Sequence, residues 1–600
     1  MKRSALLPLT LALGCAAGQN GDTPTPPTAT GAEDIARAGV EDDALGALLS
    51  EHWAYLMKTN PVWATRLGDH RYDDRLGDGS EAAIDADRKA TRAFLARAKA
   101  VPTEGLSQAD ATTLELFTSM LEKNAALDVC QFETWALSPR SNPVTNYNEL
   151  AKAHPIKSNE DANNLLKRYG QAATQIDHTT ANLARGAKAG VYANAESVRR
   201  VQAMVKDQLA KPVKDWPPMK IETDYAWGDG EEEKFTTALQ KLLENEIRPA
   251  FERYGKLLET EIAPNARSPE QTGLGALPFG KDCYQARIAY YTGLPLSAKD
   301  IHETGKSEIL RINGEMKKLG KKLFGTDALP EILEKLRTDP ANFFETSEQI
   351  VDKAETALAN ARAAIPKYFG VLPKADCVVA KIPDYEAPFT TVAYYQQPVP
   401  DGSKPGEYYV NLYKPETRTR YEMEALSFHE AIPGHHLQIA IAQELPAMPA
   451  FRRHLGLTAF VEGWALYTEQ LADEMGLYSG DLDRMGMLSY EAWRASRLVV
   501  DTGIHAMGWS RERAKQYMLE HTALAANNID NEVDRYIVWP GQAVAYKTGQ
   551  MEIWRLRREA ETALGDKFDI KGFHDAVLTG GAVSLPVLKK RVHRWADSLK

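Results

Sequence analysis

Apolar residues recur at three- and four-residue spacing along most of the chain, interspersed with Ala, Glu, Lys and Arg. Residues 233–263 and 352–368 are two clear examples, and this spacing is typical of helices that bury one face. Clusters of Pro, Gly and Asp separate the periodic stretches, as at Asn60-Pro61 and Trp216-Pro217-Pro218. The pattern predicts a mainly α-helical fold.

The stretch from about residue 377 to 413 departs from the helical pattern. It contains three β-branched or aromatic runs with turn residues between them. The runs are Val378-Val379-Ala380, residues 390–395 and residues 407–413. We expect a small β-sheet here, immediately before the segment that carries the candidate chemistry.

The third of these runs contains Tyr409 and Asn411, which we take as candidate substrate-binding residues. If the run lies at the edge of the sheet, an extended peptide can pair with its backbone. Its alternation of side chains suits plain packing within a sheet equally well. Both interpretations remain open from the sequence.

The first fifteen residues have the pattern of an export signal. Lys2 and Arg3 precede a short apolar run at residues 5–13, which ends in Gly14-Cys15. The run is too short to span a bilayer and suits the apolar region of a signal peptide. Cys15 resembles the lipidated cysteine of a bacterial lipobox. The alternative is an ordinary cleaved signal in which Cys15 is incidental.

Residues 16–33 are rich in Pro, Thr, Gly and Ala and show no periodicity, so we interpret them as a flexible tether. The folded part should begin near Asp34 and extend to the carboxyl terminus. These features predict an exported protein that a lipid anchor at Cys15 holds on a membrane of the bacterial cell envelope.

Composition changes this picture little. The 600 residues are 44% hydrophobic and 26% charged, as in an ordinary globular protein, and the net charge is −10. No basic field is available to hold nucleic acid. The cysteines other than Cys15 are Cys130, Cys283 and Cys377, which are too widely spaced for a metal cluster. They permit at most one disulfide, and we favour buried thiols.

The strongest candidate chemistry lies at His429-Glu430, followed by Pro433-Gly434-His435. We expect a helix that starts at Pro415 and carries His429 and Glu430 near its end. Two histidines six residues apart face opposite sides of a regular helix. Pro433 and Gly434 can interrupt the helix and return His435 to the place of a ligand one turn after His429. The alternative is a pair of ordinary surface or core histidines.

Glu462 lies within a largely apolar helical run whose buried face is marked by Phe460, Trp464, Tyr467 and Leu471. A carboxylate in such surroundings needs a partner, unless it lies on the solvated side of the helix. As a third ligand it completes a set of two His and one Glu with an open fourth position, which is the pattern of catalytic zinc. Glu430 would then serve as the general base.

HEAIPGHHLQ followed by VEGWALYTEQ resembles the bacterial domain-of-unknown-function 885 (DUF885) family, which is grouped with zinc metallopeptidases. The family pattern is HE, two variable residues, PGH, Gln three positions on, and later EGWA. The resemblance covers nearly all of the mature chain and favours His435 over His436 as the ligand. An early segment that includes Pro61, Leu67-Gly68-Asp69 and Tyr72-Asp73 also resembles the family; we take the adjacent Asp69 and His70 as structural.

Two downstream segments, residues 494–505 and 532–547, are similar to the family as well. His505, Tyr536 and Tyr546 are candidate donors to the oxyanion that forms when water adds to a carbonyl. Arg497 and Arg535 are candidates for binding a substrate carboxylate. Each of these residues can alternatively tie helices together.

The sequence therefore predicts a helical hydrolase domain over residues 34–600 that binds one Zn²⁺ per chain through His429, His435 and Glu462. By analogy with helical zinc peptidases, two lobes would surround a cleft. Peptides are the favoured substrates. The alternatives are a zinc amidase or esterase for small molecules or cell-wall fragments, and a non-catalytic surface-anchored binding protein. The oligomeric state is left open.

Overall fold

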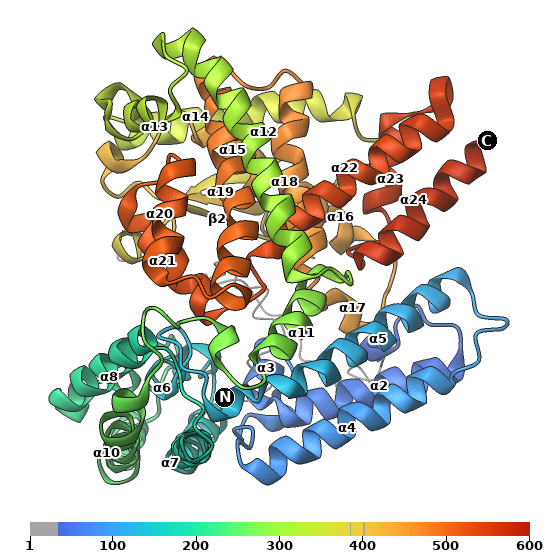
Figure 1. Ribbon diagram of the computed structural model, residues 1–600. Helices are drawn as coiled ribbons and strands as arrows, with labels where there is room; N and C mark the ends of the chain where they lie inside the picture. Colours follow the sequence, from blue (N-terminus) through green and yellow to red (C-terminus); the bar gives the residue numbers. More distant parts are fainter. Residues whose placement is uncertain (1–33, 385, 400–401) are drawn as a thin grey trace. The chain divides into compact units, whose positions relative to one another are not determined.

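The computed structural model describes residues 34–384, 386–399 and 402–600 (Figure 1). Helices dominate, and the described residues add a three-stranded sheet, which confirms the predicted mainly α fold with a small sheet. The proposed signal peptide, the tether and Cys15 lie outside the described residues. Within the described chain, no helix is both long and apolar enough to span a bilayer.

The chain divides into two compact units. The described part of the first runs from residue 34 to Cys283 and also includes Ala447–Leu455, and the second comprises Tyr284–Pro446 and Gly456–Lys600. Helix α11 (Gly280–Thr292) carries the chain from the first unit into the second. A cleft between two lobes stays a prediction.

The regular elements among the described residues of the first unit are helices, and none of the three strands belongs to it. Its main helices are α2 (Asp43–Thr59), α3 (Pro61–Arg66), α4 (Glu81–Ala100), α5 (Gln108–Ala126), α6 (Pro143–Asn148), α7 (Asn159–Lys188), α8 (Ala195–Ala210), α9 (Glu231–Leu242), α10 (Arg248–Leu257) and α17 (Ala450–Arg453). The last of these comes from the excursion of the chain at Ala447–Leu455 and packs on α2 and α5.

The predicted helix at residues 233–263 is continuous but contains two π-helical turns, Leu243–Ile247 and Leu258–Ile262. Its buried apolar residues recur almost strictly every four positions, and this spacing would drift around a helix with 3.6 residues per turn. The wider π turns compensate for the drift, so one apolar face stays directed at α7.

Cys130 and Cys283 form a disulfide within the first unit, whereas Cys377 is a buried free thiol. The expectation of buried thiols is therefore confirmed for Cys377 and wrong for the other two. The paired cysteines are 153 residues apart in the sequence, so only the folding of the chain brings them together.

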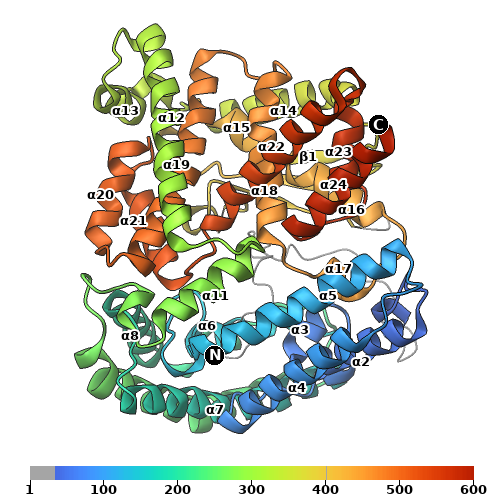
Figure 2. The same cartoon turned by 45° about the vertical axis from the view of Figure 1, so that its right-hand side comes forward.

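The second unit contains the remaining helices and the sheet. Its helices are α12 (Ala298–Phe324), α13 (Leu329–Thr338), α14 (Ser347–Ala364), α15 (Met423–Glu430), α16 (His435–Glu444), α18 (Thr458–Glu474), α19 (Asp481–Ala506), α20 (Arg511–His521), α21 (Ala526–Val538), α22 (Val544–Leu564), α23 (Ile570–Leu578) and α24 (Leu585–Leu599). Figure 2 shows α12 beside α19, and α18 packs on α22.

Glycines allow these helix pairs to approach closely. A Cβ atom on Gly549 of α22 would lie 1.7 Å from the carbonyl oxygen of Ala459 on α18, and one on Gly463 would lie 2.5 Å from the Gly549 backbone. The two helices therefore cross in backbone contact directly beside Glu462, which fixes the depth of that side chain in the unit.

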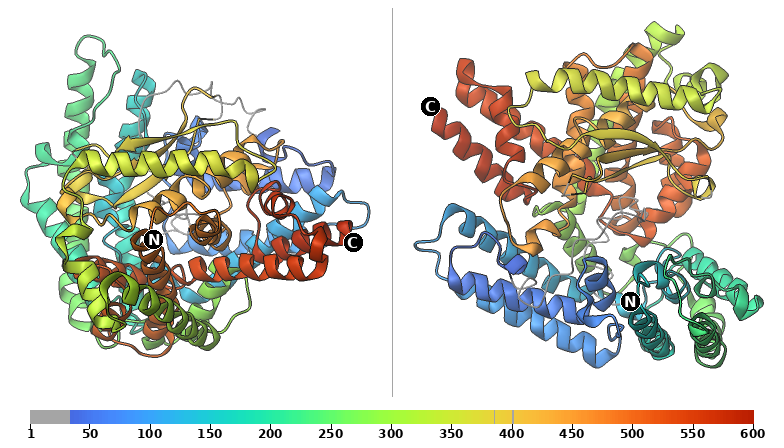
Figure 3. Two further views of the ribbon diagram at one scale, coloured as in Figure 1. Left: turned by 90° about the horizontal axis from the view of Figure 1, so that it is seen from above. Right: turned by 180° about the vertical axis from the view of Figure 1, so that it is seen from behind.

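The sheet consists of β1 (Cys377–Lys381), β2 (Ala393–Gln396) and β3 (Gly406–Val410), in the order β1-β3-β2. Strand β3 pairs with β1 in parallel and with β2 in antiparallel register. Helix α14 packs on β1 and α15 on β2, and Figure 3 shows the strands from two further sides.

Because β3 is the middle strand, the prediction that it offers a free edge to a peptide is wrong. The side chain of Asn411 donates to the carbonyls of Ala387 and Thr391, and the Tyr409 hydroxyl donates to Glu407. The Tyr409 ring also stacks on Tyr394 of β2 with the ring centroids 4.8 Å apart, so both residues make internal packing contacts, as the packing alternative expected.

Candidate metal centre

The two candidate histidines lie on either side of a break between helices. Helix α15 ends at Glu430 and α16 begins at His435, with a cis peptide between Ile432 and Pro433. A Cβ atom on Gly434 would lie 1.9 Å from the backbone oxygen of His429, so only glycine fits there. The interruption predicted at Pro433 and Gly434 is confirmed.

The predicted start of this helix at Pro415 is wrong. Pro415–Thr417 forms a single 3₁₀ turn, and α15 begins at Met423. Between them the backbone pairs with a distant segment instead of continuing the helix: Arg418 accepts from the Phe344 amide, and the Arg420 amide donates to Asn342.

His429, His435 and Glu462 meet in the second unit. Glu462 Oε2 is 3.6 Å from His429 Nε2 and 3.6 Å from His435 Nε2, and the three potential ligand atoms lie within 4.8 Å of one another. All three side chains are buried. Two histidines and one carboxylate from three different helices thus converge on one point.

Several polar atoms of this cluster have no hydrogen-bond partner among the described residues. They are both ring nitrogens of His435, Oε2 of Glu462 and Oε2 of the adjacent Glu430. Leaving such atoms unpaired in the interior costs about 1–3 kcal/mol each. A cation bound at the point of convergence would satisfy Nε2 of His435 and Oε2 of Glu462 together.

Glu469 binds the ring nitrogen of His429 that does not face Glu462. Its Oε1 accepts from His429 Nδ1 at 2.8 Å, which leaves Nε2 of that ring for a metal. Arg494 Nη2 lies 3.5 Å from the same oxygen. A carboxylate behind a ligating histidine orients the ring and increases its basicity. Sequence reasoning gave Glu469 no role, although its spacing of seven from Glu462 places both on one helix face.

The electrostatics of the cluster favour a cation. Burial alone would lower the pKa of His429, but two carboxylates raise it to about 9: Glu462, whose Oε2 lies 3.6 Å from Nε2, and Glu469, which accepts from Nδ1. Burial opposes ionisation of Glu462, yet the two histidines hold its pKa well below the usual range. The carboxyl of Glu430 has a raised pKa, chiefly because it is buried.

His436 is turned away from the cluster. Its Nδ1 accepts from the Tyr395 hydroxyl at 3.0 Å, and its Nε2 donates to the Ala375 carbonyl at 3.1 Å. Burial lowers the pKa of His436 to about 4, so the ring is neutral. The structure therefore assembles the cluster with His435 and uses His436 to attach α16 to the sheet region.

Tyr546 lies beside the cluster. It is one turn before Gly549 on α22, where that helix crosses α18 next to Glu462. Burial, with the nearby Glu462 carboxylate, raises the pKa of the Tyr546 hydroxyl to about 12. This hydroxyl accepts from Gln542 at 3.4 Å and keeps its own proton available for another acceptor.

The other two candidate oxyanion donors make internal contacts. Tyr536 donates from its hydroxyl to Glu532 at 2.6 Å and accepts from Arg497 Nε at 3.0 Å. His505 Nε2 lies 3.0 Å from the backbone oxygen of Tyr536. These contacts match the alternative that both residues tie α19 to α21.

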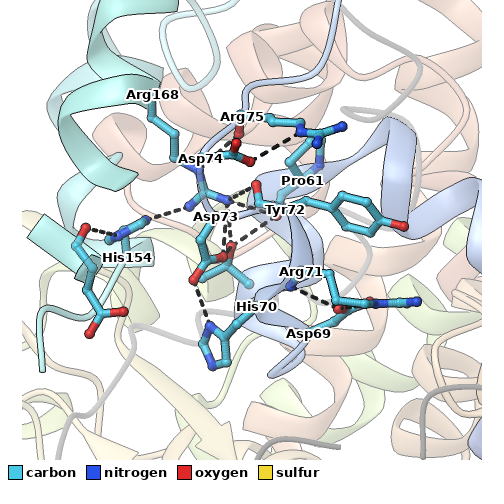
Figure 4. Close-up of polar contacts among 12 residues, drawn as sticks. Pro61, Asp69, His70, Arg71, Tyr72, Asp73, Asp74, Arg75, His154 and Arg168 are labelled. Atoms are coloured by element: carbon cyan, nitrogen blue, oxygen red, sulfur yellow. Dashed lines mark hydrogen bonds and ion pairs between the residues drawn. The ribbon is translucent and has the colours of Figure 1, made fainter. Parts of the chain in front are cut away.

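Asp69 and His70 belong to a structural network in the first unit (Figure 4). Asp69 pairs with Arg71, and His70 Nδ1 is 2.8 Å from Asp73 Oδ2. At its centre the fully buried Arg168 donates to several carbonyls and side chains of this segment. The structural interpretation of the early segment is supported.

Comparison with known proteins links the chain to one family and to two solved structures. The family described as "Bacterial protein of unknown function (DUF885)" matches residues 61–592. A candidate lipoprotein from Colwellia psychrerythraea is similar with 26% identity and a TM-score of 0.82, covering 92% of this chain and 99% of that one.

A second solved structure, a candidate lipoprotein of unknown function from Shewanella oneidensis, has 20% identity and a TM-score of 0.71. The match covers 91% of this chain and 98% of the other. At this identity the likeness establishes a shared fold. A comparison with curated proteins gives no match.

Proposed function

The chain belongs to the bacterial DUF885 family, and we propose that it is a zinc-dependent hydrolase, most simply a peptidase. The observation that carries this proposal is the buried convergence of His429, His435 and Glu462 with unpaired atoms directed at one another. Their convergence on one point distinguishes these atoms from the isolated unpaired atoms elsewhere among the described residues.

The geometry fits zinc. Tetrahedral zinc with ligands at about 2.0–2.1 Å holds neighbouring ligand atoms roughly 3.3 Å apart. Glu462 Oε2 lies 3.6 Å from each of the two histidine Nε2 atoms, close to this spacing, and the three ligand atoms lie within 4.8 Å of one another, so they can close around one ion. Three protein ligands leave a fourth position open, which is typical of catalytic sites.

Zinc bound there would polarise a substrate carbonyl and lower the pKa of a water molecule. Glu430, which follows the ligand His429 directly, offers the unpaired Oε2 as the base that takes a proton from water. The same carboxyl can then pass the proton to the leaving amine.

Tyr546 is positioned to donate its hydroxyl proton to an oxyanion formed beside Glu462. The same groups would hydrolyse a small amide or ester, so a zinc amidase or esterase is the second candidate. A non-catalytic binding protein would need neither an unpaired Glu430 nor an open ligand position.

Glu430→Gln tests the proposal. We expect the variant to keep zinc and fold but to lower turnover by about 10²- to 10⁴-fold, the usual contribution of a general base. Turnover is measured on peptide, amide and ester panels with zinc-loaded protein, whose metal content is determined by elemental analysis.

Glu424→Gln is the matched control, because Glu424 is also buried on α15 but pairs with Lys353 and Ser479. This variant should retain turnover. Near-normal turnover in zinc-loaded Glu430→Gln, or no hydrolysis of any panel by the wild-type protein, would refute the proposed mechanism.

We also propose that the protein is lipid-anchored at the cell envelope. The similar proteins of Colwellia psychrerythraea and Shewanella oneidensis are described as candidate lipoproteins. The disulfide between Cys130 and Cys283 agrees with export, because such bonds persist mainly in oxidising compartments.

A further inference from the structure

Two buried guanidinium groups beside the metal centre share a single carboxylate. Arg535 binds both oxygens of Glu532, at 3.1 and 2.9 Å, and Arg497 Nη2 lies 3.1 Å from Oε2 of the same residue. The trio carries a formal net charge of +1. The remaining nitrogen of Arg535, Nη1, donates to Gln542 Oε1 at 2.7 Å, so all of the donor nitrogens of Arg535 are hydrogen-bonded.

Arg497 retains a free donor. Its Nε and Nη2 are paired, but Nη1 is buried and has no hydrogen-bond partner among the described residues. The residue is 4% exposed. Its guanidinium lies 4.4 Å from the ring centroids of both Trp493 and Tyr546, so two aromatic faces hold its plane in place. A positively charged, fixed and unpaired N–H group is suited to an anion.

The position of Arg497 on α19 relates it to the metal centre. Arg494 lies one turn before it on α19 and contacts Glu469, the carboxylate behind His429. Trp493 packs against both guanidinium groups, at 4.5 Å from Arg494 and 4.4 Å from Arg497. This segment of α19 therefore extends from the metal cluster to the free donor.

Contacts with helix α22 also place Arg497 near the proposed zinc position. Tyr546 packs on Arg497 with its ring and lies one turn before the close crossing beside Glu462. Tyr546 thus contacts the guanidinium of Arg497 and also lies next to the helix crossing beside Glu462 and the proposed zinc position.

We propose that Arg497 is the specificity-determining residue of this site and that it selects substrates with a carboxylate near the bond to be cleaved. The inference rests on the proposed hydrolase function. The carboxylate would pair with Nη1 and neutralise the excess charge of the trio. Its two chemical sources are the free carboxyl terminus of a peptide and an Asp or Glu side chain.

Binding to zinc-loaded Glu430→Gln, which does not depend on turnover, tests the inference. The probes are N-acetyl tripeptides prepared as free acids and as carboxyl-terminal amides, with Kd measured by calorimetry. A charge-assisted hydrogen bond in a buried site predicts about 10- to 100-fold tighter binding of the acids. Amides with an internal Asp or Glu distinguish the side-chain source from the terminal one.

Arg497→Lys in the same background should reduce the preference for acids to less than about threefold, because lysine cannot reproduce the fixed planar donor. Arg535→Lys is the matched control: it also changes a partner of Glu532 but removes no free donor, so the preference should remain. Thermal unfolding verifies that both variants fold.

Equal binding of acids and amides by the parent protein, or no binding of either, overturns the inference even if Arg497→Lys fails to fold. An acid preference that Arg535→Lys abolishes as fully as Arg497→Lys also overturns it. Acid-selective binding without any cleavage by the wild-type protein would support the inference and refute the proposed hydrolase. Cleavage without acid preference would do the reverse.

Discussion

His435 and His436 are adjacent imidazoles whose surroundings give them different roles. His435 has an unpaired Nε2 that lies 3.6 Å from Glu462, whereas both nitrogens of His436 are bonded, to Tyr395 and Ala375. A ligand needs a free lone pair directed at the ion, and this condition is met by His435 alone of the two.

We therefore expect opposite effects from replacing the two histidines with alanine. His435→Ala should weaken zinc binding by more than about 100-fold, since loss of an outer partner alone costs about 10- to 100-fold. His436→Ala should keep zinc but lower the free energy of unfolding by about 2 kcal/mol, because two buried partners lose their hydrogen bonds. Zinc titration and chemical denaturation measure the two effects. Zinc loss in His436→Ala with retention in His435→Ala would contradict this ligand set.

The helix–turn–helix segment formed by α15, the turn at Pro433-Gly434 and α16 is the element on which the site depends. Gly434 lies at the break between the two helices, and α16 begins so that the ring of its first residue, His435, lies 4.8 Å from the ring of His429 in the last turn of α15. Trp464 of α18 donates to the Pro433 carbonyl at 3.0 Å and so attaches this turn to the helix that carries Glu462.

Gly434→Ala should displace His435, because the new Cβ would lie against the His429 carbonyl. We expect at least about tenfold weaker zinc binding and a loss of more than about 1 kcal/mol in stability. Gly314→Ala is the control, since a Cβ on Gly314 of α12 meets open space and should stabilise the helix by about 0.5–1 kcal/mol. Unchanged zinc affinity in Gly434→Ala would show that the turn does not position the ligand.

At the scale of the whole molecule, the cluster of His429, His435 and Glu462 belongs to the second unit, yet the chain between His435 and Glu462 leaves that unit. Ala447–Leu455, which lies between His435 and Glu462 in the sequence, belongs to the first unit and packs there on α2 and α5. The chain therefore passes between the two units in α11 and again in the segment between His435 and Glu462.

Attachment to a membrane is the prediction at this scale. Cys15→Ser should move the protein from the membrane fraction to the soluble fraction or stall its processing, because stable anchoring needs two or more acyl chains. Cys377→Ser, which changes a buried thiol in the second unit, should leave the fractionation unaltered. Mass spectrometry of the mature amino terminus provides the decisive measurement. An unmodified terminus created by cleavage at another position would make the protein freely secreted or periplasmic.

The cluster of His429, His435 and Glu462 could be predicted from the sequence because its signals are local. The proline and glycine between His429 and His435 indicate a broken helix, and the apolar neighbours of Glu462 indicate a buried carboxylate that needs a partner. Helical periodicity likewise predicts which face of a segment is buried, since it depends only on residues a few positions apart.

Contacts between distant segments were decided by the tertiary structure. The order of the strands placed β3 in the middle of the sheet. Backbone hydrogen bonds to residues 342–344 replaced the helix that was expected to start at Pro415. Folding also brought Cys130 and Cys283 together as a disulfide. The same holds for the carboxylate of Glu469 behind His429 and the free donor of Arg497. Periodicity specifies that such side chains are buried, but which polar atoms find partners depends on the three-dimensional meeting of helices far apart in the sequence.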